Sequence, residues 1–314
     1  MKRLFLSGCI ILASAFALHA QYDAQFSQYF KAMNYYNPAV AGNTDDLNAL
    51  AFYRLQWQGI PNAPRSFFIT ADMPLSLGKT RHGAGIIVYT DEAGLFRNTH
   101  YAAQYACKFK LFNGTLSVGM QLGVVNQSFD GTGVYIPPSD GHVQADDAFP
   151  TTKVQAMAFD MNLGLYFSNR HLYAGIATTH LTQPQLQLEE NIYTYIGRAY
   201  NFTAGYNIQL NNPLYEIQPS VFIKTDMQSI QADITGRVVY NKMFNGGISW
   251  RINESAVLMF GATIGRFDVG YAYDFPITSL LKGSSGSHEI MVRYRIKLQK
   301  SKTGKFKHKS VRIL

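Results

Sequence analysis

Few residues of this chain could do chemistry, and most of them lie in one polar stretch. The stretch SDGHVQADDAFP combines carboxylates with an imidazole, groups that bind divalent cations in proteins; these are Asp140, His142, Asp146 and Asp147. Their spacing matches neither an EF-hand nor a zinc-site pattern. Because Asp-Gly is also a common turn dipeptide, a solvated polar loop is the preferred interpretation.

The remaining histidines give no catalytic or metal-binding pattern. Outside the first twenty residues no two of them are four residues apart; they are His82, His100, His171, His180, His288 and His308. No nucleophile elbow, P-loop, HExxH or Rossmann motif occurs in the context that it requires. A nucleophile and base assembled from distant strands would leave no such motif, but nothing points to one. We expect no enzyme, no metal site and no cofactor.

Basic residues are concentrated at the C-terminus. The formal net charge is +8, and the residues from Lys297 to Leu314 hold seven Lys or Arg and no acid, so the body of the chain is near neutral. Outside the cytoplasm such a tail would attract acidic proteins, lipid headgroups or cell-wall polymers rather than nucleic acid. A solvated tail without a partner is the competing interpretation. The residues concerned are Lys300, Lys302, Lys305, Lys307, Lys309 and Arg312.

The N-terminus reads as a secretory signal peptide. MKR precedes the apolar run LFLSGCIILASAFAL, and small residues lead to a predicted cleavage after Ala20. The sequence from Leu6 to Cys9 resembles a lipoprotein processing box, but too few apolar residues precede it, so lipidation is disfavoured. Cleavage after Ala20 leaves Cys107 as the single cysteine, which excludes an internal disulfide.

Composition and periodicity predict a transmembrane β-barrel. Only 15% of the 314 residues are charged and 14% are aromatic, and no apolar run is long enough for a spanning helix. Stretches such as TLSVGMQLGVV alternate apolar with small or polar residues over about ten residues, the length of a tilted strand that crosses a bilayer. A soluble sandwich would have shorter strands and a more charged outer face.

Counting these stretches predicts an outer-membrane barrel of about fourteen antiparallel strands, an even number as in closed single-chain barrels. The predicted strands are 48–57, 65–75, 81–90, 98–112, 115–125, 154–168, 170–180, 198–210, 214–225, 230–241, 243–253, 256–266, 267–275 and 287–298.

Connection lengths predict the orientation. Every second connection is tight, as at Asn113-Gly114 and Asn241-Lys242, whereas the others, including 58–64, 91–97, 126–153, 181–197 and 276–286, are mostly long. Outer-membrane barrels place short turns in the periplasm and long loops outside. Both termini are therefore expected in the periplasm.

The stretch FSQYFKAMNYYNPAVAG before the first strand fits neither a strand nor a signal peptide. A turn is expected at Asn37-Pro38, because the residue before proline is driven out of the helical region. We expect a short helix or irregular segment from Asp23 to Met33 at or in the periplasmic mouth, as a plug; a loose linker is the alternative. The predicted organisation is signal peptide 1–20, periplasmic plug segment 21–47, barrel 48–298 and basic periplasmic tail 299–314.

Two motifs lie near the N-terminus. The first comprises Phe26, Ser27, Gln28, Tyr29, Asn37, Pro38, Ala39, Ala41 and Gly42, and the second Tyr53, Arg54, Gln56, Trp57, Pro61, Ala63 and Pro64. Both motifs resemble those of the PorP/SprF family of the Bacteroidetes type IX secretion and gliding machinery. The closing His288-Glu289-Ile290 is similar to the end of that family as well.

The resemblance implies a non-enzymatic component of the type IX system in the outer membrane that helps to secrete or display cargo. Its implied partners are other type IX components of the periplasm and outer membrane, peptidoglycan-associated proteins, secreted cargo or an adhesin, and outer-membrane lipids. Some family members serve general secretion and others one adhesin, and the sequence does not separate these roles. A general porin or solute channel remains the alternative function.

Overall fold

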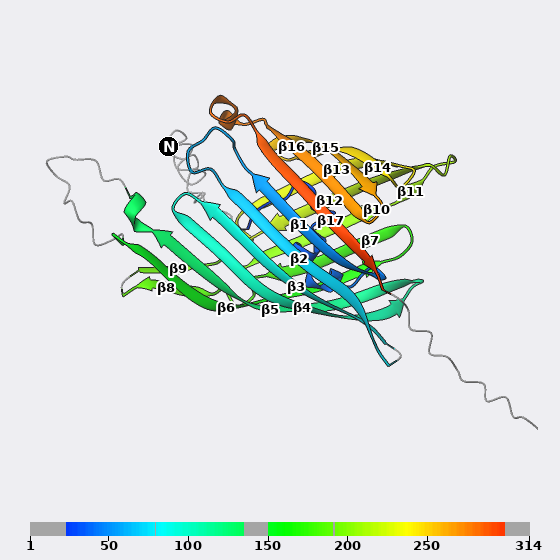
Figure 1. Ribbon diagram of the computed structural model, residues 1–314, viewed down its shortest axis with the longest axis horizontal. Helices are drawn as coiled ribbons and strands as arrows, with labels where there is room; N and C mark the ends of the chain where they lie inside the picture. Colours follow the sequence, from blue (N-terminus) through cyan, green and yellow to red (C-terminus); the bar gives the residue numbers. More distant parts are fainter. Residues whose placement is uncertain (1–22, 79, 135–149, 191, 299–314) are drawn as a thin grey trace, which may run out of the picture.

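The computed structural model describes residues 23–78, 80–134, 150–190 and 192–298. The predicted signal peptide, the basic tail 299–314 and the four candidate residues of the polar loop lie outside these ranges. The described chain is almost entirely β-structure (Figure 1). Its strands are β1 Asp46–Leu55, β2 Arg65–Leu77, β3 Thr80–Ala93, β4 Phe96–Leu111, β5 Gly114–Asp130, β6 Lys153–Ser168, β7 Leu172–Thr179, β8 Gln185–Glu189, β9 Ile192–Tyr195, β10 Ala199–Tyr206, β11 Ile208–Gln209, β12 Tyr215–Thr225, β13 Ile230–Tyr240, β14 Phe244–Arg251, β15 Ser255–Ile264, β16 Phe267–Pro276 and β17 Ser287–Lys297.

Fourteen antiparallel strands close into a barrel, as the alternation predicts. Neighbours in sequence pair in order from β1 to β7, and β1 closes one seam by pairing with β17 from Asp46↔Lys297 to Leu55↔His288. β10 pairs with both β7 and β12, which completes the ring. The two-residue β11 continues β10 after Asn207 along the same neighbour, so the two count as one strand of the ring.

The connections divide the barrel into two ends. The tight-turn end holds the connections 78–79, 112–113, 169–171, 210–214, 241–243 and 265–266, and the long-loop end holds 56–64, 94–95, 131–152, 180–198, 226–229, 252–254 and 277–286. One expectation is wrong here: the connection expected at 91–97 is a two-residue turn, because β3 and β4 remain paired out to Ala93↔Phe96. The turn after β4 is centred on Phe112 and Asn113, both with positive φ, one residue before the expected Asn-Gly pair.

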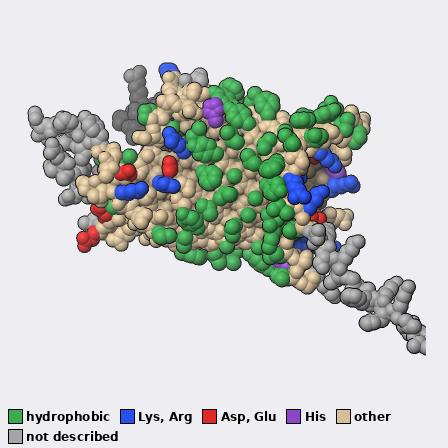
Figure 2. Space-filling model, in the orientation of Figure 1, with side chains coloured by type: hydrophobic (Ala, Val, Ile, Leu, Met, Phe, Trp, Pro, Cys, Tyr) green, Lys and Arg blue, Asp and Glu red, His purple; other side chains and the backbone are tan. Residues whose placement is uncertain are grey.

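The two faces of each strand separate as the period of two requires. On β5, Val118, Met120 and Leu122 are exposed on the outside, whereas Ser117 and Gln121 are buried in the interior. Figure 2 shows hydrophobic side chains spread over the middle of the barrel wall, with charged side chains gathered toward its two ends. This distribution is that of a barrel surrounded by lipid.

One hairpin is additional to the predicted strands. β8 and β9 pair with each other inside the connection 180–198, which was expected to be a loop. Leu186 of β8 and Ile196 are buried with Val125 of β5, so the hairpin packs against the barrel. The short helical elements are α2 Met33–Tyr36 and the 3₁₀ turns η1 Pro38–Val40, η2 Gly131–Gly133 and η3 Ser279–Lys282. Among the described residues no helix is long and apolar enough to cross a membrane.

Candidate functional site

Residues 23–45, the lumen segment, run through the inside of the barrel from one end to the other. Asp23 contacts Thr179 and His180 at the long-loop end. Gly42 donates its N–H to Asp72 (2.8 Å) shortly before β1 begins at the tight-turn end. The segment therefore extends along the lumen rather than stopping in the tight-turn mouth. Asp23 and Lys297, near the two ends of the described chain, consequently lie at opposite ends of the barrel.

Aromatic side chains form the apolar half of the contact between segment and wall. The ring of Phe26 lies 5.4 Å from that of Phe52 and 4.9 Å from that of Phe68, both on the barrel wall. Tyr29 stacks on Phe222 of β12 at 5.2 Å. Such offset and edge-to-face pairs add to the free energy gained by burial itself. The lumen thus has a packed core to which the segment supplies the central rings.

A buried ionic centre forms the polar half of this contact. Arg54 of β1 and Arg251 of β14 both pair with the Asp274 carboxylate, at 2.6 and 3.0 Å. Arg54 also pairs with Glu289 (3.2 Å), and Arg251 with Asp233 (3.0 Å). All five side chains are buried. Charges removed from water in this way must be paired and hydrogen-bonded, because an unpaired buried charge is strongly destabilising.

The backbone of the lumen segment completes the ionic centre. Glu289 accepts hydrogen bonds from the backbone N–H groups of Ser27 (2.7 Å) and Gln28 (2.9 Å). The Ser27 hydroxyl donates to Asp274 (2.6 Å) and accepts from Arg54 (2.9 Å). Three buried carboxylates and the partly exposed Glu254, which pairs with Arg251 at 3.2 Å, face two guanidinium groups. Donors from the segment therefore satisfy acceptor sites that the arginines leave open. The Phe-Ser-Gln motif therefore fits this particular charge arrangement.

Nearer the tight-turn end the segment is held by further polar contacts. Lys31 pairs with Asp268 at 2.7 Å, and Arg293 donates to the Lys31 carbonyl at 3.1 Å. The Arg237 guanidinium lies 3.5 Å from the centre of the Phe30 ring, a cation–π contact. Charged wall residues thus contact the segment both at the ionic centre and nearer the tight-turn end.

The Asn37-Pro38 turn is fixed by close backbone approach. Asn37 donates its side-chain amide to the Leu165 carbonyl (3.0 Å) and accepts from the Ala39 N–H (2.9 Å). A Cβ atom at Gly119 would stand 2.2 Å from the Ala39 nitrogen, and one at Gly83 would stand 1.9 Å from the Ala41 oxygen. Glycine at these wall positions lets the segment lie directly against the strands.

The structure brings together only part of the residues singled out in the sequence. The whole first motif is buried in the lumen, and Arg54 of the second motif reaches it (1% exposed). Tyr53 points outward (43% exposed), as strand alternation requires. The other members of the second motif, Gln56, Trp57, Pro61, Ala63 and Pro64, lie in the connection 56–64 at the long-loop end. The tail residues Lys300, Lys302, Lys305, Lys307, Lys309 and Arg312 lie outside the described residues.

Arg251 and Lys224 were not recognised as site residues from the sequence. Arg251 is the residue that joins Asp233 and Asp274, and Lys224 donates to the Asp23 carbonyl at 2.7 Å. A charged residue on the inward face of a predicted strand is the signal that would have found them.

Replacing Arg54 with methionine tests whether the ionic centre holds the fold together. Arg54→Met keeps the apolar stem but leaves Glu289 without its cation and Asp274 with Arg251 alone, so we expect the free energy of unfolding to fall by about 3–5 kcal/mol. Urea titration of the purified barrel in lipid measures this change. Arg97→Met is the matched control, because Arg97 pairs with Glu92 on the exposed surface. The free energy of unfolding of this variant should fall by at most about 1 kcal/mol. Equal losses in the two variants would contradict the assignment.

Comparison with known proteins identifies the family of the chain. The family described as type IX secretion system membrane protein PorP/SprF matches residues 18–294. No curated protein sequence matches. Similar solved structures include the toluene transporter TbuX of Ralstonia pickettii (14% identity, 83% of this chain and 92% of that one, TM-score 0.47). The translocator domain of autotransporter NalP from Neisseria meningitidis is another (10%, 87% and 95%, TM-score 0.43). The chain belongs to the PorP/SprF family of type IX secretion system membrane proteins, as its motifs predict.

Proposed function

We propose that this chain is a non-enzymatic outer-membrane component of the type IX machinery, needed for the secretion or surface display of cargo through protein–protein contacts. The observation that carries the proposal is the filled lumen, in which the segment 23–45 is tied to the wall by the buried ionic centre. A barrel whose interior is occupied along its length is suited to act as a scaffold rather than as an open pore.

The partners that fit this role meet the barrel at its ends and on its lipid face. We infer contacts with other type IX components of the periplasm and outer membrane, with peptidoglycan-associated proteins and with secreted cargo or an adhesin. Membership of the family supports an association with other secretion components. The wall itself presents apolar side chains to outer-membrane lipids.

The alternative function is a general porin or solute channel. A porin keeps a water-filled lumen lined by polar side chains. The aromatic cluster of Phe26, Tyr29 and Tyr35 in the middle of this lumen argues against such a path. Measuring conductance in the resting state separates the two functions.

Leucine substitution at Gly119 tests the function of the filled lumen. A side chain at Gly119 collides with Ala39, so Gly119→Leu should displace the lumen segment. We expect the unaltered protein to show no steady conductance in planar bilayers. Gly119→Leu should open a conductance, and cells that carry it should secrete less type IX cargo. Secretion is measured as the fraction of cargo in the medium or on the cell surface.

Gly236→Leu is the matched control, because a Cβ atom at Gly236 meets nothing within 4 Å. This variant should behave like the unaltered protein in both assays. Steady large conductance of the unaltered protein would support the porin instead. A conducting Gly119→Leu variant with undiminished secretion would exclude a role of the segment in secretion.

We further propose that the tight-turn end faces the periplasm and the long-loop end faces the outside of the cell, the arrangement of outer-membrane barrels generally. The C-terminal end of β17 is then periplasmic, whereas Asp23 lies toward the cell surface.

Cysteine labelling tests this orientation. In a Cys107→Ala background, a membrane-impermeant maleimide should label Gln58→Cys on intact cells but not Thr44→Cys, because these exposed positions lie at the long-loop and tight-turn ends. Permeabilised cells should label both variants, which controls for reactivity. Labelling of Thr44→Cys alone on intact cells would reverse the orientation.

The basic tail is proposed as a periplasmic contact for an acidic partner surface. Deleting residues 300–314 should leave the barrel assembled and reduce recovery of type IX components in a pull-down from detergent-solubilised membranes. A variant with Gln at Lys300, Lys302, Lys305, Lys307, Lys309 and Arg312 keeps the length but removes the charge, and should behave like the deletion if charge is responsible. Unchanged recovery in both variants would refute this role.

A further inference from the structure

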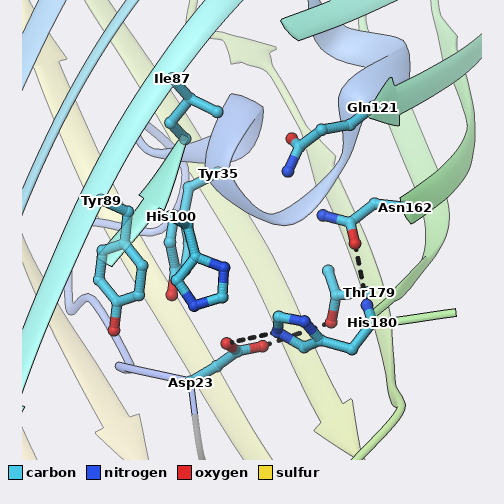
Figure 3. Close-up of a pocket in the computed structure, with 9 residues that line it drawn as sticks. All are labelled: Asp23, Tyr35, Ile87, Tyr89, His100, Gln121, Asn162, Thr179 and His180. Atoms are coloured by element: carbon cyan, nitrogen blue, oxygen red, sulfur yellow. Dashed lines mark hydrogen bonds and ion pairs between the residues drawn. The ribbon is translucent and has the colours of Figure 1, made fainter. Parts of the chain in front are cut away.

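A small polar cavity lies where the lumen segment enters the barrel at the long-loop end. It has a volume of about 20 Å³, which is room for a single water molecule or ion. Figure 3 shows the rings of His100 and His180 and the Asp23 carboxylate around it, with the amides of Gln121 and Asn162 on the opposite side. The family motifs and the proposed function make no use of this place.

Three potential metal ligands meet beside the cavity. One donor atom each from His100, Asp160 and His180 lies within 4.8 Å of the others. His100 comes from β4, Asp160 from β6, and His180 directly follows β7. Because these elements are distant in sequence, no spacing motif could reveal the cluster. Asp160 and His180 are buried, which protects a bound ion from exchange with bulk water.

Carboxylates fix the ring of His180 at both of its nitrogens. Its Nδ1 is hydrogen-bonded to Asp160 at 2.8 Å and its Nε2 to Asp23 at 3.0 Å. Its backbone N–H donates to Asn162 (2.9 Å), which fixes the start of the connection. In metal sites a histidine ligand commonly gives its second ring nitrogen to a carboxylate in this manner.

The environment of His100 differs from that of His180. Among the described residues its ring makes contacts with the rings of Tyr89 and His180, at 5.5 and 5.4 Å between centroids, and no hydrogen bond. His100 is partly buried, and its ring lies close to the Asp160 carboxylate and to the His180 imidazole.

We propose that His100, Asp160 and His180 bind one divalent transition-metal ion of the Zn²⁺ type, with Asp23 as the carboxylate that orients His180. Two imidazoles and one carboxylate form a ligand set that suits Zn²⁺ and disfavours Mg²⁺ or Ca²⁺, which prefer oxygen ligands alone. The ion would connect three wall strands and, through Asp23, the first described residue of the lumen segment. Metal binding would thereby strengthen the attachment of the segment at its entry.

The test uses the tag-free, full-length mature protein in detergent, from which metals have been removed with EDTA. This protein is then titrated with Zn²⁺. Equilibrium dialysis with elemental analysis should show one Zn²⁺ per chain. His100→Gln and His180→Gln should each weaken binding by at least tenfold. Asp23→Asn should weaken it by about 10- to 100-fold, the usual effect of removing a carboxylate that orients a ligand. Substituted Co²⁺ should give the visible absorption of a site with nitrogen and oxygen ligands.

His171→Gln is the matched control, since His171 lies at the tight-turn end and should leave zinc binding unchanged. Two measurements verify that each variant is a folded barrel. These are circular dichroism and a difference in gel migration between unheated and heated samples. Absence of stoichiometric zinc binding by the unaltered protein would overturn the proposal, as would equal binding by folded His100→Gln. Undiminished binding by Asp23→Asn would overturn the link to the lumen segment.

Discussion

The burial of two guanidinium groups inside a closed barrel is the constraint on which the interior depends. Arg54 and Arg251 are removed from water, so each needs carboxylates within hydrogen-bonding distance. Asp233, Asp274 and Glu289 supply them from three other strands. The surplus of negative charge is met by hydrogen-bond donors of the lumen segment, chiefly the N–H groups of Ser27 and Gln28. The wall carboxylates therefore pair with wall arginines and, in addition, accept hydrogen bonds from the lumen segment.

The same complementarity explains how the lumen is filled. The inward faces of the strands carry many small residues, so they leave space that side chains from the wall do not occupy. Phe26, Tyr29 and Tyr35 fill that space, and Gly83 and Gly119 allow the backbone of the segment to lie against the strands.

Strand positions could be predicted from the sequence because a period of two is a local property of the chain. All fourteen predicted strands have a counterpart in the barrel, and the tight connections at 78–79 and 241–243 fall where turn residues indicate. The connection 94–95 was expected to be long because polar residues such as Asp91 and Asn98 are typical of a loop. In the structure these residues pair with each other and extend β3 and β4. The β8–β9 hairpin was missed because its stability comes from packing on β5 and β6 rather than from its own pattern.

The sequence by itself determined the barrel, its number of strands and the family, since alternation, turn chemistry and two short motifs are all written within local stretches. Only the tertiary structure decided where the motif residues lie and which wall residues they contact. Ser27 and Glu289 are separated by 262 positions and become partners only when the ring closes through β1 and β17. His100, Asp160 and His180 lie on or directly after β4, β6 and β7, so the pairing register of these neighbouring strands brings them together. Contacts across a lumen depend on closure and register, and no local pattern records which inward-facing residues will share one depth.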